Sequence, residues 1–551
     1  MGDVSFAAVE HASWRLRLPV AREVVLCTGL AATAASLLVW LGPPGGDLAA
    51  HEYQRSLFLV HGFTPWNNFW YAGRYAFVGY SILYYPLAAL LGIRLLAVLT
   101  VALAAAPFAL LLEREWSRAA RWPGRSFAVV WAGIVITGEL PFALGVALAL
   151  LALLALRAGW RWTGAVLMLL VVAASPVALL LLAVVLAGIF VVRRAPFRRY
   201  AVPAFALAVA AAAELVLLRL FPAGGALAFP WYEAAAAATF CVIGIALVWR
   251  IERASVLRGV FCIYLATIAV AFVVPSGLGD NVNRLRFLAL PLALLTVSLR
   301  RWRPLPVTLA AVALAGVWNV SPLAAGWTRS AADRSSRPMV WTQPVGYLHA
   351  HLRTGYRVEA VDTSQHWPAF YLAGAGIPLV RGWFRQDDYP FDRLLYRRFT
   401  PVQYVDWLRR LGVAYVVLTN APPDYTSRRE AKLVRTGETV LRRVFATRYV
   451  SIYAVPHPRP ILTGPGRPAV LALRQSRLVI RVSRGGTYHL ALRWSPYWHA
   501  STGCLARAPG GMLRLRTRTA GTVRLGFDVD ASTLVDAFAG AAPRCRSPGR
   551  S

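Results

Sequence analysis

Lysine is almost absent from this sequence, and acidic residues are scarce. Arg and Lys number 59 against 25 Asp and Glu, and Lys432 is the only lysine, so arginine supplies nearly all of the formal charge of +34. Such a charge is typical of nucleic-acid-binding proteins. Here, however, much of the arginine lies in short loops between long apolar runs, where cytoplasmic retention and anionic lipid account for it. We therefore exclude nucleic acid as a partner and interpret the arginine content as the codon bias of a GC-rich genome.

Cysteine is also rare, and the spacings of common catalytic motifs are missing. Cys27, Cys241 and Cys262 lie in apolar runs and are interpreted as small core residues. Cys504 and Cys545 lie in the polar C-terminal part, where they could form one disulfide on an oxidising side of a membrane. No CxxC or His/Cys metal spacing is present, and no GxGxxG, Walker, HExxH or GxSxG motif. These absences argue against nucleotide-driven pumps and against hydrolases of those types.

Apolar residues dominate what remains. The chain of 551 residues is 58% hydrophobic, with a mean hydropathy of +0.52. Runs of about 20 apolar residues, the length that crosses a bilayer, recur between residues 24 and 327. Because only helices and closed barrels satisfy the backbone in lipid, these runs predict an α-helical polytopic membrane domain. We expect about 9–13 helices, half-helices included, each long enough to cross or partly cross the bilayer.

The first apolar run sets the predicted orientation. Arg15, Arg17 and Arg22 precede the run at 24–41, and no small-residue cleavage site follows it, so we interpret it as a retained span. The positive-inside rule then places the N-terminus in the cytoplasm and the first loop, residues 42–76, outside the cell. The protein is thus expected in the cell membrane.

Three interruptions shape the next part of the chain. A short re-entrant or interfacial helix is expected around residues 80–91, broken at Pro86. The apolar blocks at 127–156 and 166–192 are interrupted at residues 138–141 and at Ser175-Pro176. Each block is either one kinked span or a hairpin of half-length helices that meet near the midplane. Both alternatives return the chain to the cytoplasm, so the later topology is the same.

The C-terminal part changes in character after the last apolar run. We predict a transmembrane domain at 1–327, an extracytoplasmic α/β domain at 328–462, and an extracytoplasmic antiparallel, β-sandwich-like module at 463–551. Strands are expected at 356–362 and 414–419, with a helix at 401–411. Period-2 alternation predicts further strands at 477–483, 487–494, 512–517 and 522–528.

Polar and aromatic residues gather in the stretch 46–85. A carboxylate can take a proton from an incoming hydroxyl, and aromatic faces stack on sugar rings. This chemistry selects as candidates Asp47, His51, Glu52, Trp66, Arg74 and Tyr85. The alternative is an interfacial loop whose Trp and Tyr rings lie at headgroup level, and the sequence leaves both interpretations open.

A second polar stretch, residues 276–286, is predicted on the same outer face. Arg284 and Arg286 carry guanidinium forks that suit a phosphate group, with Asn283 and Asp280 beside them. Alternatively, the two arginines extend toward lipid headgroups. Glu139 interrupts an apolar block, and an ionisable group there costs about 2.5–3.5 kcal/mol unless it is paired or faces a cavity. We therefore include Glu139 as a candidate substrate-binding residue.

Several of these motifs resemble a known class of enzyme. Asp47 and His51-Glu52 in the first loop are followed by Gly62-x-x-Pro65-Trp66 and by Tyr85-Pro86-Leu87. This pattern resembles the membrane glycosyltransferases of the GT-C class. More narrowly, the stretches 138–142, 279–285 and 366–416 are similar to actinobacterial membrane proteins labelled "6-pyruvoyl-tetrahydropterin synthase-related".

The resemblance implies a function. It implies a polyprenyl-phosphate-linked sugar as donor, a cell-envelope glycan as acceptor, and catalysis on the outer face of the membrane. A first-loop carboxylate would serve as base, a role that falls on Asp47, with Glu52 second and His51 beside it. GT-C enzymes often show adjacent carboxylates, whereas these two stand apart, so the identity of the base and the need for a divalent metal stay open. The alternative function is a non-enzymatic transporter or scaffold for envelope lipid or glycan.

Overall fold

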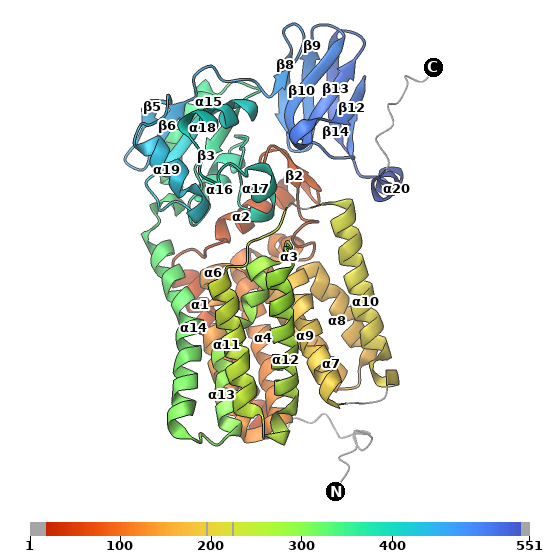
Figure 1. Cartoon of the computed structure of the whole chain (residues 1–551), viewed down its shortest axis with the longest axis vertical. Helices are drawn as coiled ribbons and strands as arrows, with labels where there is room; N and C mark the ends of the chain where they lie inside the picture. The colour runs from red at the N-terminus through yellow and green to blue at the C-terminus, as the bar shows by residue number, and fades with distance from the viewer. Residues whose placement is uncertain (1–17, 194–196, 223–224, 541–551) are drawn as a thin grey trace.

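The computed structural model describes residues 18–193, 197–222 and 225–540. A bundle of long helices forms one half of the molecule, and the sheets stand on one end of it (Figure 1). Nine stretches of the described residues are long and apolar enough to cross a membrane. The predicted architecture is therefore confirmed: this is a multi-pass membrane protein whose helical domain is followed by a sheet-containing region.

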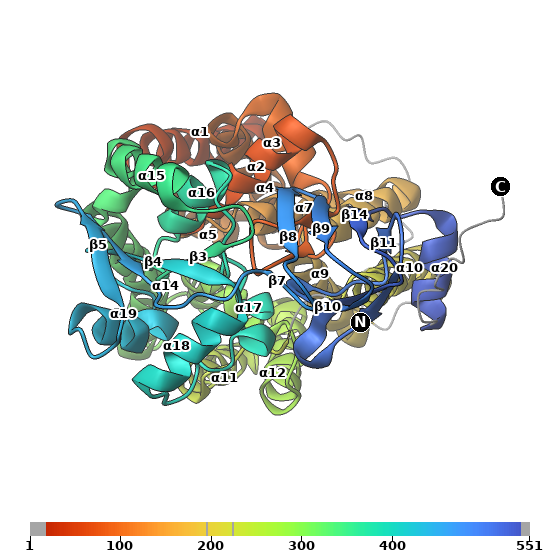
Figure 2. The same ribbon diagram turned by 90° about the horizontal axis from the view of Figure 1, so that it is seen from above.

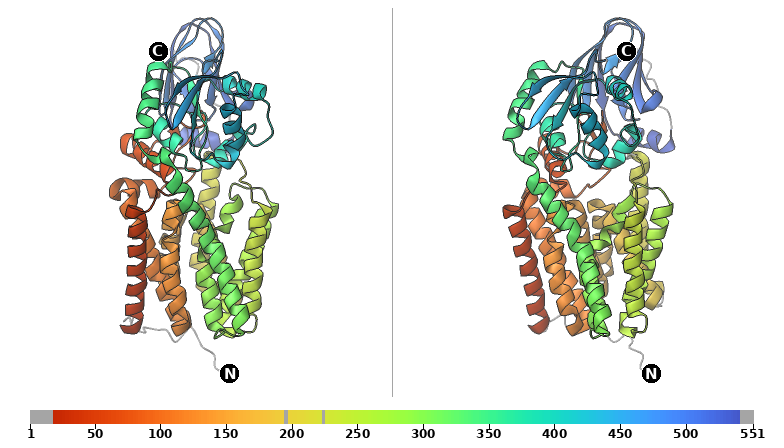
Figure 3. Two further views of the ribbon diagram at one scale, coloured as in Figure 1. Left: turned by 90° about the vertical axis from the view of Figure 1, so that its left-hand side faces the viewer. Right: turned by 60° about the vertical axis from the view of Figure 1, so that its left-hand side comes forward.

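The bundle is built from apolar helices rich in Ala, Leu and Val. Their bounds are α1 (Leu18–Leu41), α4 (Ile93–Trp116), α5 (Arg121–Trp131), α6 (Ile134–Thr137), α7 (Leu140–Arg157), α8 (Arg161–Ala174), α9 (Pro176–Arg193), α10 (Phe197–Leu220), α11 (Trp231–Val248), α12 (Ser255–Val273), α13 (Ala289–Leu299) and α14 (Leu305–Ala332). A 3-10 helix, η4 (Gly279–Leu288), precedes α13. The long helix α14 leads from the bundle into the sheet-containing region (Figure 3).

Only one end of the bundle is covered by the sheets. At one end, Arg125 pairs with Glu23 at 2.7 Å, and Arg157 pairs with Glu115 at 2.6 Å. The sheets stand on the opposite end, which we call the capped end and which carries the backbone around Asp47. The helices thus place the first loop and the C-terminal sheets at one end, as the alternation of spans predicts. Which compartment the capped end faces remains a prediction.

The two interrupted apolar blocks are hairpins. The Asp47 backbone N–H donates to the Thr137 carbonyl oxygen at 3.1 Å, and the Leu83 N–H donates to Ala173 at 2.9 Å. Both breaks therefore lie at the capped end. Neither block is a single kinked span, and the alternative of half-length helices that meet near the midplane is wrong as well. The physical reason is that Gly138, with φ +81°, is a left-handed cap that ends α6 after a complete pass.

Proline acts here as a helix starter. Pro141 and Pro176 stand in the first turns of α7 and α9, where a missing N–H costs nothing. Pro86 likewise lies in the first turn of α3 (Tyr84–Leu91), so the short predicted helix exists but is not broken at that proline.

The part of the tail nearest the bundle is an α/β unit. Its sheet has the order β3-β4-β6-β5, with β3 and β4 parallel and the other pairs antiparallel. The strands are β3 (Arg357–Ala360), β4 (Val413–Thr419), β5 (Arg442–Ala446) and β6 (Val450–Ala454), and the helices are α15 (Met339–His351), α16 (Trp367–Gly374), α17 (Arg385–Phe391), α18 (Pro401–Arg410) and α19 (Arg428–Arg435). The two strands and the helix expected here are confirmed.

The last part is a sandwich of two four-stranded sheets, ordered β12-β13-β10-β7 and β11-β14-β9-β8. The strands are β7 (Leu462–Thr463), β8 (Ala469–Arg474), β9 (Arg477–Val482), β10 (Gly486–Arg493), β11 (Trp498–Ala500), β12 (Cys504–Arg507), β13 (Met512–Thr517) and β14 (Gly521–Phe527), followed by α20 (Ala531–Ala539). Their period-2 alternation buries one side of each strand, for example Leu513 and Leu515, as predicted. Cys545 lies outside the described residues, so the predicted disulfide remains a prediction.

The first loop packs into the tail. Its helix α2 (Leu48–His61) lies against α16, as seen from above in Figure 2. Its short strands, β1 (Trp66–Asn67) and β2 (Arg74–Tyr75), flank the buried rings of Trp70 and Tyr71. Trp70 is fully buried and its Nε1 donates to the Ala369 carbonyl oxygen at 3.0 Å. These rings lie inside the protein, which contradicts the alternative that they rest at headgroup level.

Candidate active site

Asp47 stands at the junction of the bundle and the tail. It occupies the cap position before α2, and its side chain is half-buried. The Trp383 Nε1–H donates to Asp47 Oδ1 at 2.9 Å. Within the described part of the chain, Oδ2 makes no hydrogen bond. One carboxylate oxygen is therefore held in place while the other is free to accept a proton.

His51 lies one helical turn after Asp47 and is completely buried. Its Nε2 is 2.8 Å from the Gly138 carbonyl oxygen, which can only accept, so Nε2 carries the proton. Nδ1 then accepts from the Tyr85 hydroxyl at 3.1 Å, and Gln54 Nε2 donates to that hydroxyl at 2.8 Å. Burial lowers the pKa of His51 to about 4, so the ring is neutral. Both ring nitrogens are engaged, which leaves His51 no atom for a substrate.

Glu139 and Arg284 face each other next to this group. Arg284 Nε lies 3.6 Å from Glu139 Oε2, and both side chains are largely buried. The guanidinium also stacks over the Phe142 ring at 4.8 Å and donates from Nη2 to Asn281 Oδ1 at 2.7 Å. Glu139 Oε2 receives no hydrogen bond from the described residues. Burial raises the pKa of Glu139, against the opposing effect of Arg284.

A second polar group is centred on Glu233, in the first turn of α11. Asn283 Nδ2 donates to Glu233 Oε2 at 2.6 Å, and Arg286 Nη1 lies 3.5 Å from the same oxygen. Asn283 Oδ1 and Arg286 Nε are buried without a hydrogen-bond partner among the described residues. Unpaired buried polar atoms are costly, so these atoms are available to a ligand. Asp280 lies in the first turn of η4 and is exposed.

Three candidates lie elsewhere. Glu52 follows Asp47 by five residues, which turns it to another side of α2, and it lies 4.0 Å from Arg55. Trp66 is buried in the sandwich core, where its ring stacks on Phe527 at 4.6 Å.

Arg74 is buried as well, and its Nε donates to Asp387 Oδ2 at 2.6 Å. Each of these three side chains is therefore engaged by a partner other than the residues around Asp47.

Trp383 and Glu233, which connect the main groups of the site, are absent from the sequence-based candidates. Trp383 lies in the polar stretch 381–388, whose mixture of aromatic and charged residues indicates a carbohydrate contact or packing against the membrane domain, and the structure shows the packing contact. Glu233 is recognisable as an ionisable residue at the start of an apolar run. No sequence pattern indicates that Trp383 contacts Asp47 or that Glu233 contacts Asn283.

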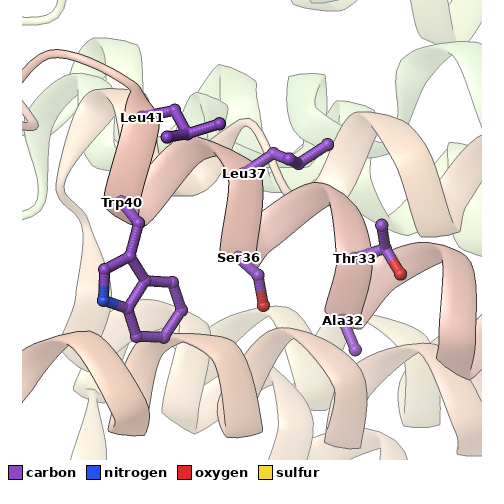
Figure 4. A pocket seen from close by; sticks show the side chains of 6 residues that line it. All are labelled: Ala32, Thr33, Ser36, Leu37, Trp40 and Leu41. Carbon is purple, nitrogen blue, oxygen red and sulfur yellow. The ribbon is translucent and has the colours of Figure 1, made fainter.

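Two grooves lie away from this site. A space of about 470 Å³ adjoins the exposed side of α1, along Ser36, Leu37 and Trp40 (Figure 4). A second, of about 310 Å³, lies between α11, α12, α13 and α14 and is lined by Phe240 and Trp318 among small residues. Neither contains Asp47 or Arg284, so neither defines the polar site.

The described side chains form no complete metal site of their own. Among residues 18–193, 197–222 and 225–540, no group of three or more His, Cys, Asp or Glu side chains could hold a metal ion. We therefore derive no step that involves the divalent metal left open by the sequence.

Comparison with known proteins gives a resemblance in fold. No family model matches the sequence, and no curated protein does. Cryo-EM structures of the arabinofuranosyltransferase AftD from Mycobacteria are similar at 18% identity, with a TM-score of 0.44. A variant of the same protein gives TM-scores of 0.44 and 0.43. The match covers 78% of this chain and 40% of AftD, so this chain spans about two fifths of the length of that protein.

Proposed function

We propose that this protein is a membrane glycosyltransferase of the GT-C type. It moves a sugar from a polyprenyl-phosphate donor to a cell-envelope glycan at the outer face. The observation that carries the proposal is the meeting of Asp47, Glu139 and Arg284 at the capped end of the bundle, from three distant stretches of sequence. A carboxylate and a guanidinium at the edge of the membrane match a reaction that needs a base and a site for an anionic leaving group.

Asp47 serves as the base in this proposal. Trp383 fixes Oδ1, so Oδ2 accepts the proton of the acceptor hydroxyl. The hydroxyl oxygen forms a bond to the sugar C1 from the face opposite to the phosphate. The C1–O bond to the phosphate breaks, and the electron pair leaves with the lipid phosphate. The reaction inverts the configuration at C1.

Arg284 and Arg286 stabilise the departing phosphate. Charge develops on the phosphate oxygen as the bond breaks, and preorganised donors stabilise that charge. The unpaired Nε of Arg286 is a donor held ready without a protein partner. Glu139 keeps the Arg284 guanidinium in position at 3.6 Å. His51 and Tyr85 act as positioning residues, because the hydrogen bonds of His51 join α2 to the Gly138 turn and, through Tyr85, to α3.

The proposal includes the orientation and the narrower family. By the positive-inside rule, the arginine-rich loops at the other end of the bundle favour an orientation with the capped end outside the cell. This orientation suits a lipid-linked donor and an envelope acceptor. The similarity to the actinobacterial "6-pyruvoyl-tetrahydropterin synthase-related" proteins belongs to the same proposal. Half-helices broken by proline at the midplane would be a feature of transporters too, but both hairpins turn at the capped end.

The test is transfer from a synthetic polyprenyl-phosphate sugar by purified protein in detergent. Asp47→Asn keeps the hydrogen bond from Trp383 but removes the base, and we expect transfer to fall by about 10²–10⁴-fold. The matched control is Glu52→Gln, the same kind of change one turn further along α2, which should leave transfer close to the unaltered rate. Undiminished transfer by Asp47→Asn would remove Asp47 as the base.

A further inference from the structure

The β-sandwich has an unusual charge. Between residues 463 and 527 the sequence contains eleven arginines and no Asp or Glu. A genome that prefers arginine to lysine gives no reason to lose acidic residues, and the α/β unit before it contains many. The absence of acidic residues is therefore a property of the sandwich itself.

These arginines lie on the outside. Ten of the eleven are exposed, and only Arg493 is buried. None of the ten forms an ion pair with a described residue. The alternation along the strands explains the exposure of these arginines. Arg514 and Arg516 alternate with the buried Leu513 and Leu515, so both arginines point away from the core.

Part of this charge is concentrated at one end of the sandwich. The Arg467 N–H donates to Ser483 Oγ at 2.9 Å, which brings two turns together. A Cβ on Gly485 would lie 2.3 Å from the Arg518 carbonyl oxygen, so a third turn adjoins them. We call this end the basic tip, and it consists of Arg467, Arg481, Arg484, Arg516 and Arg518.

The basic tip lies far from the membrane domain. The opposite end of β14 is Phe527, whose ring stacks on Trp66 of the first loop at 4.6 Å. The seven residues of β14 span about 23 Å at roughly 3.3 Å per residue. Figure 1 shows the sandwich standing upward from the capped end, with these turns uppermost. The tip therefore cannot rest on the bilayer that holds its own bundle.

We propose that the basic tip binds an acidic polysaccharide, through its carboxylate or phosphate groups. Guanidinium forks suit both groups, and unpaired like charges at one end favour a polyanion that neutralises several together. Leu471, which is not part of the tip, is the only exposed large apolar residue within 463–530, so the tip offers no aromatic ring for stacking on a neutral sugar. Recognition is by charge. This inference rests on the proposed function, because it identifies the acceptor glycan of that function as an anionic polymer.

The experiment measures binding of the full chain, in nanodiscs of zwitterionic lipid, to polygalacturonate and to neutral dextran. We expect tight binding to polygalacturonate at low salt, loss of binding as salt rises, and no binding to dextran. Arg484→Ser/Arg516→Ser/Arg518→Ser should weaken binding by at least about tenfold. The control, Arg410→Ser/Arg435→Ser/Arg443→Ser, removes the same charge from exposed arginines of the α/β unit and should bind normally.

Three results would overturn the proposal. These are equal binding to dextran, unchanged binding by the tip variant, or equal weakening by both variants. Phosphatidylglycerol vesicles that bind as tightly, through the same three arginines, would assign the tip to a lipid surface instead. Transfer from the lipid-linked donor to a short neutral acceptor is measured in parallel and should not respond to the tip variant. Absence of transfer in the unaltered protein would contradict the proposed function and leave the binding result standing.

Discussion

Trp383 and Asp47 are separated by 336 residues and joined by a hydrogen bond of 2.9 Å. The indole belongs to the tail and the carboxylate to the first loop, so this bond connects the α/β unit to the site at the end of the bundle. Because a carboxylate is orientated by the donor it meets, the tail takes part in positioning the proposed base.

Removal of this hydrogen bond should slow the reaction without preventing folding. Trp383→Phe keeps most of the ring and loses the Nε1–H. We expect kcat to fall by about tenfold, the equivalent of roughly 1.4 kcal/mol, with KM little changed. Trp40→Phe, on the exposed side of α1, is the control and should leave kcat unchanged. An unchanged kcat would show that the bond does not orientate Asp47.

Arg284 should contribute more than its charge. Arg284→Lys keeps the positive charge but loses the planar fork that contacts Asn281 and faces Glu139. We expect kcat/KM for the lipid-linked donor to fall by about 10–100-fold. Arg329→Lys changes an exposed arginine on α14 and should have little effect. Equal activity of the two variants would contradict the role given to Arg284.

The neutral state of His51 predicts a pH dependence of stability. Its pKa is about 4 in the folded protein, below the ordinary value of 6.5, so the unfolded chain binds the proton more readily. Stability from this group is complete above pH 6.5 and falls as the pH drops toward 4, by on the order of 1–3 kcal/mol. Thermal unfolding between pH 7.5 and 5 should show this slope. His51→Asn should flatten it, whereas His61→Asn, which alters an exposed ring, should leave it intact.

Arg74 should prove structural. It is 5% exposed and pairs with Asp387 at 2.6 Å, so Arg74→Met leaves an unpaired buried carboxylate. We expect a loss of about 3–5 kcal/mol in the free energy of unfolding. Arg74→Met/Asp387→Leu removes both charges and should recover much of that loss. A stable single variant with weakened donor binding would return Arg74 to the substrate site.

The sequence predicts the course of the chain well because its signals are local. Apolar runs locate the helices, and period-2 alternation locates strands such as the one from Arg477 to Val482. Spans and short loops also imply that Asp47 and Arg284 share one end of the bundle, as they do. The candidate site is thus partly readable from topology alone.

Pairings across long distances are not readable in this way. From the sequence, Arg74 resembles a substrate ligand. In the structure, its guanidinium is paired with Asp387, 313 residues later. Trp66 likewise resembles a ring that stacks on a sugar, but in the structure it is buried against Phe527 of the β-sandwich. The break in the apolar run at Gly138 is compatible with a kinked helix or with a turn between two helices. A single sequence does not show at which depth of the membrane such a break lies.

The most direct test is a cryo-EM map of the protein with a bound polyprenyl-phosphate sugar. The account predicts the phosphate within hydrogen-bonding distance of the Arg284 or Arg286 guanidinium, with the sugar C1 directed toward Asp47. A phosphate bound at the other end of the bundle, among Arg157, Arg193 and Glu115, would contradict it.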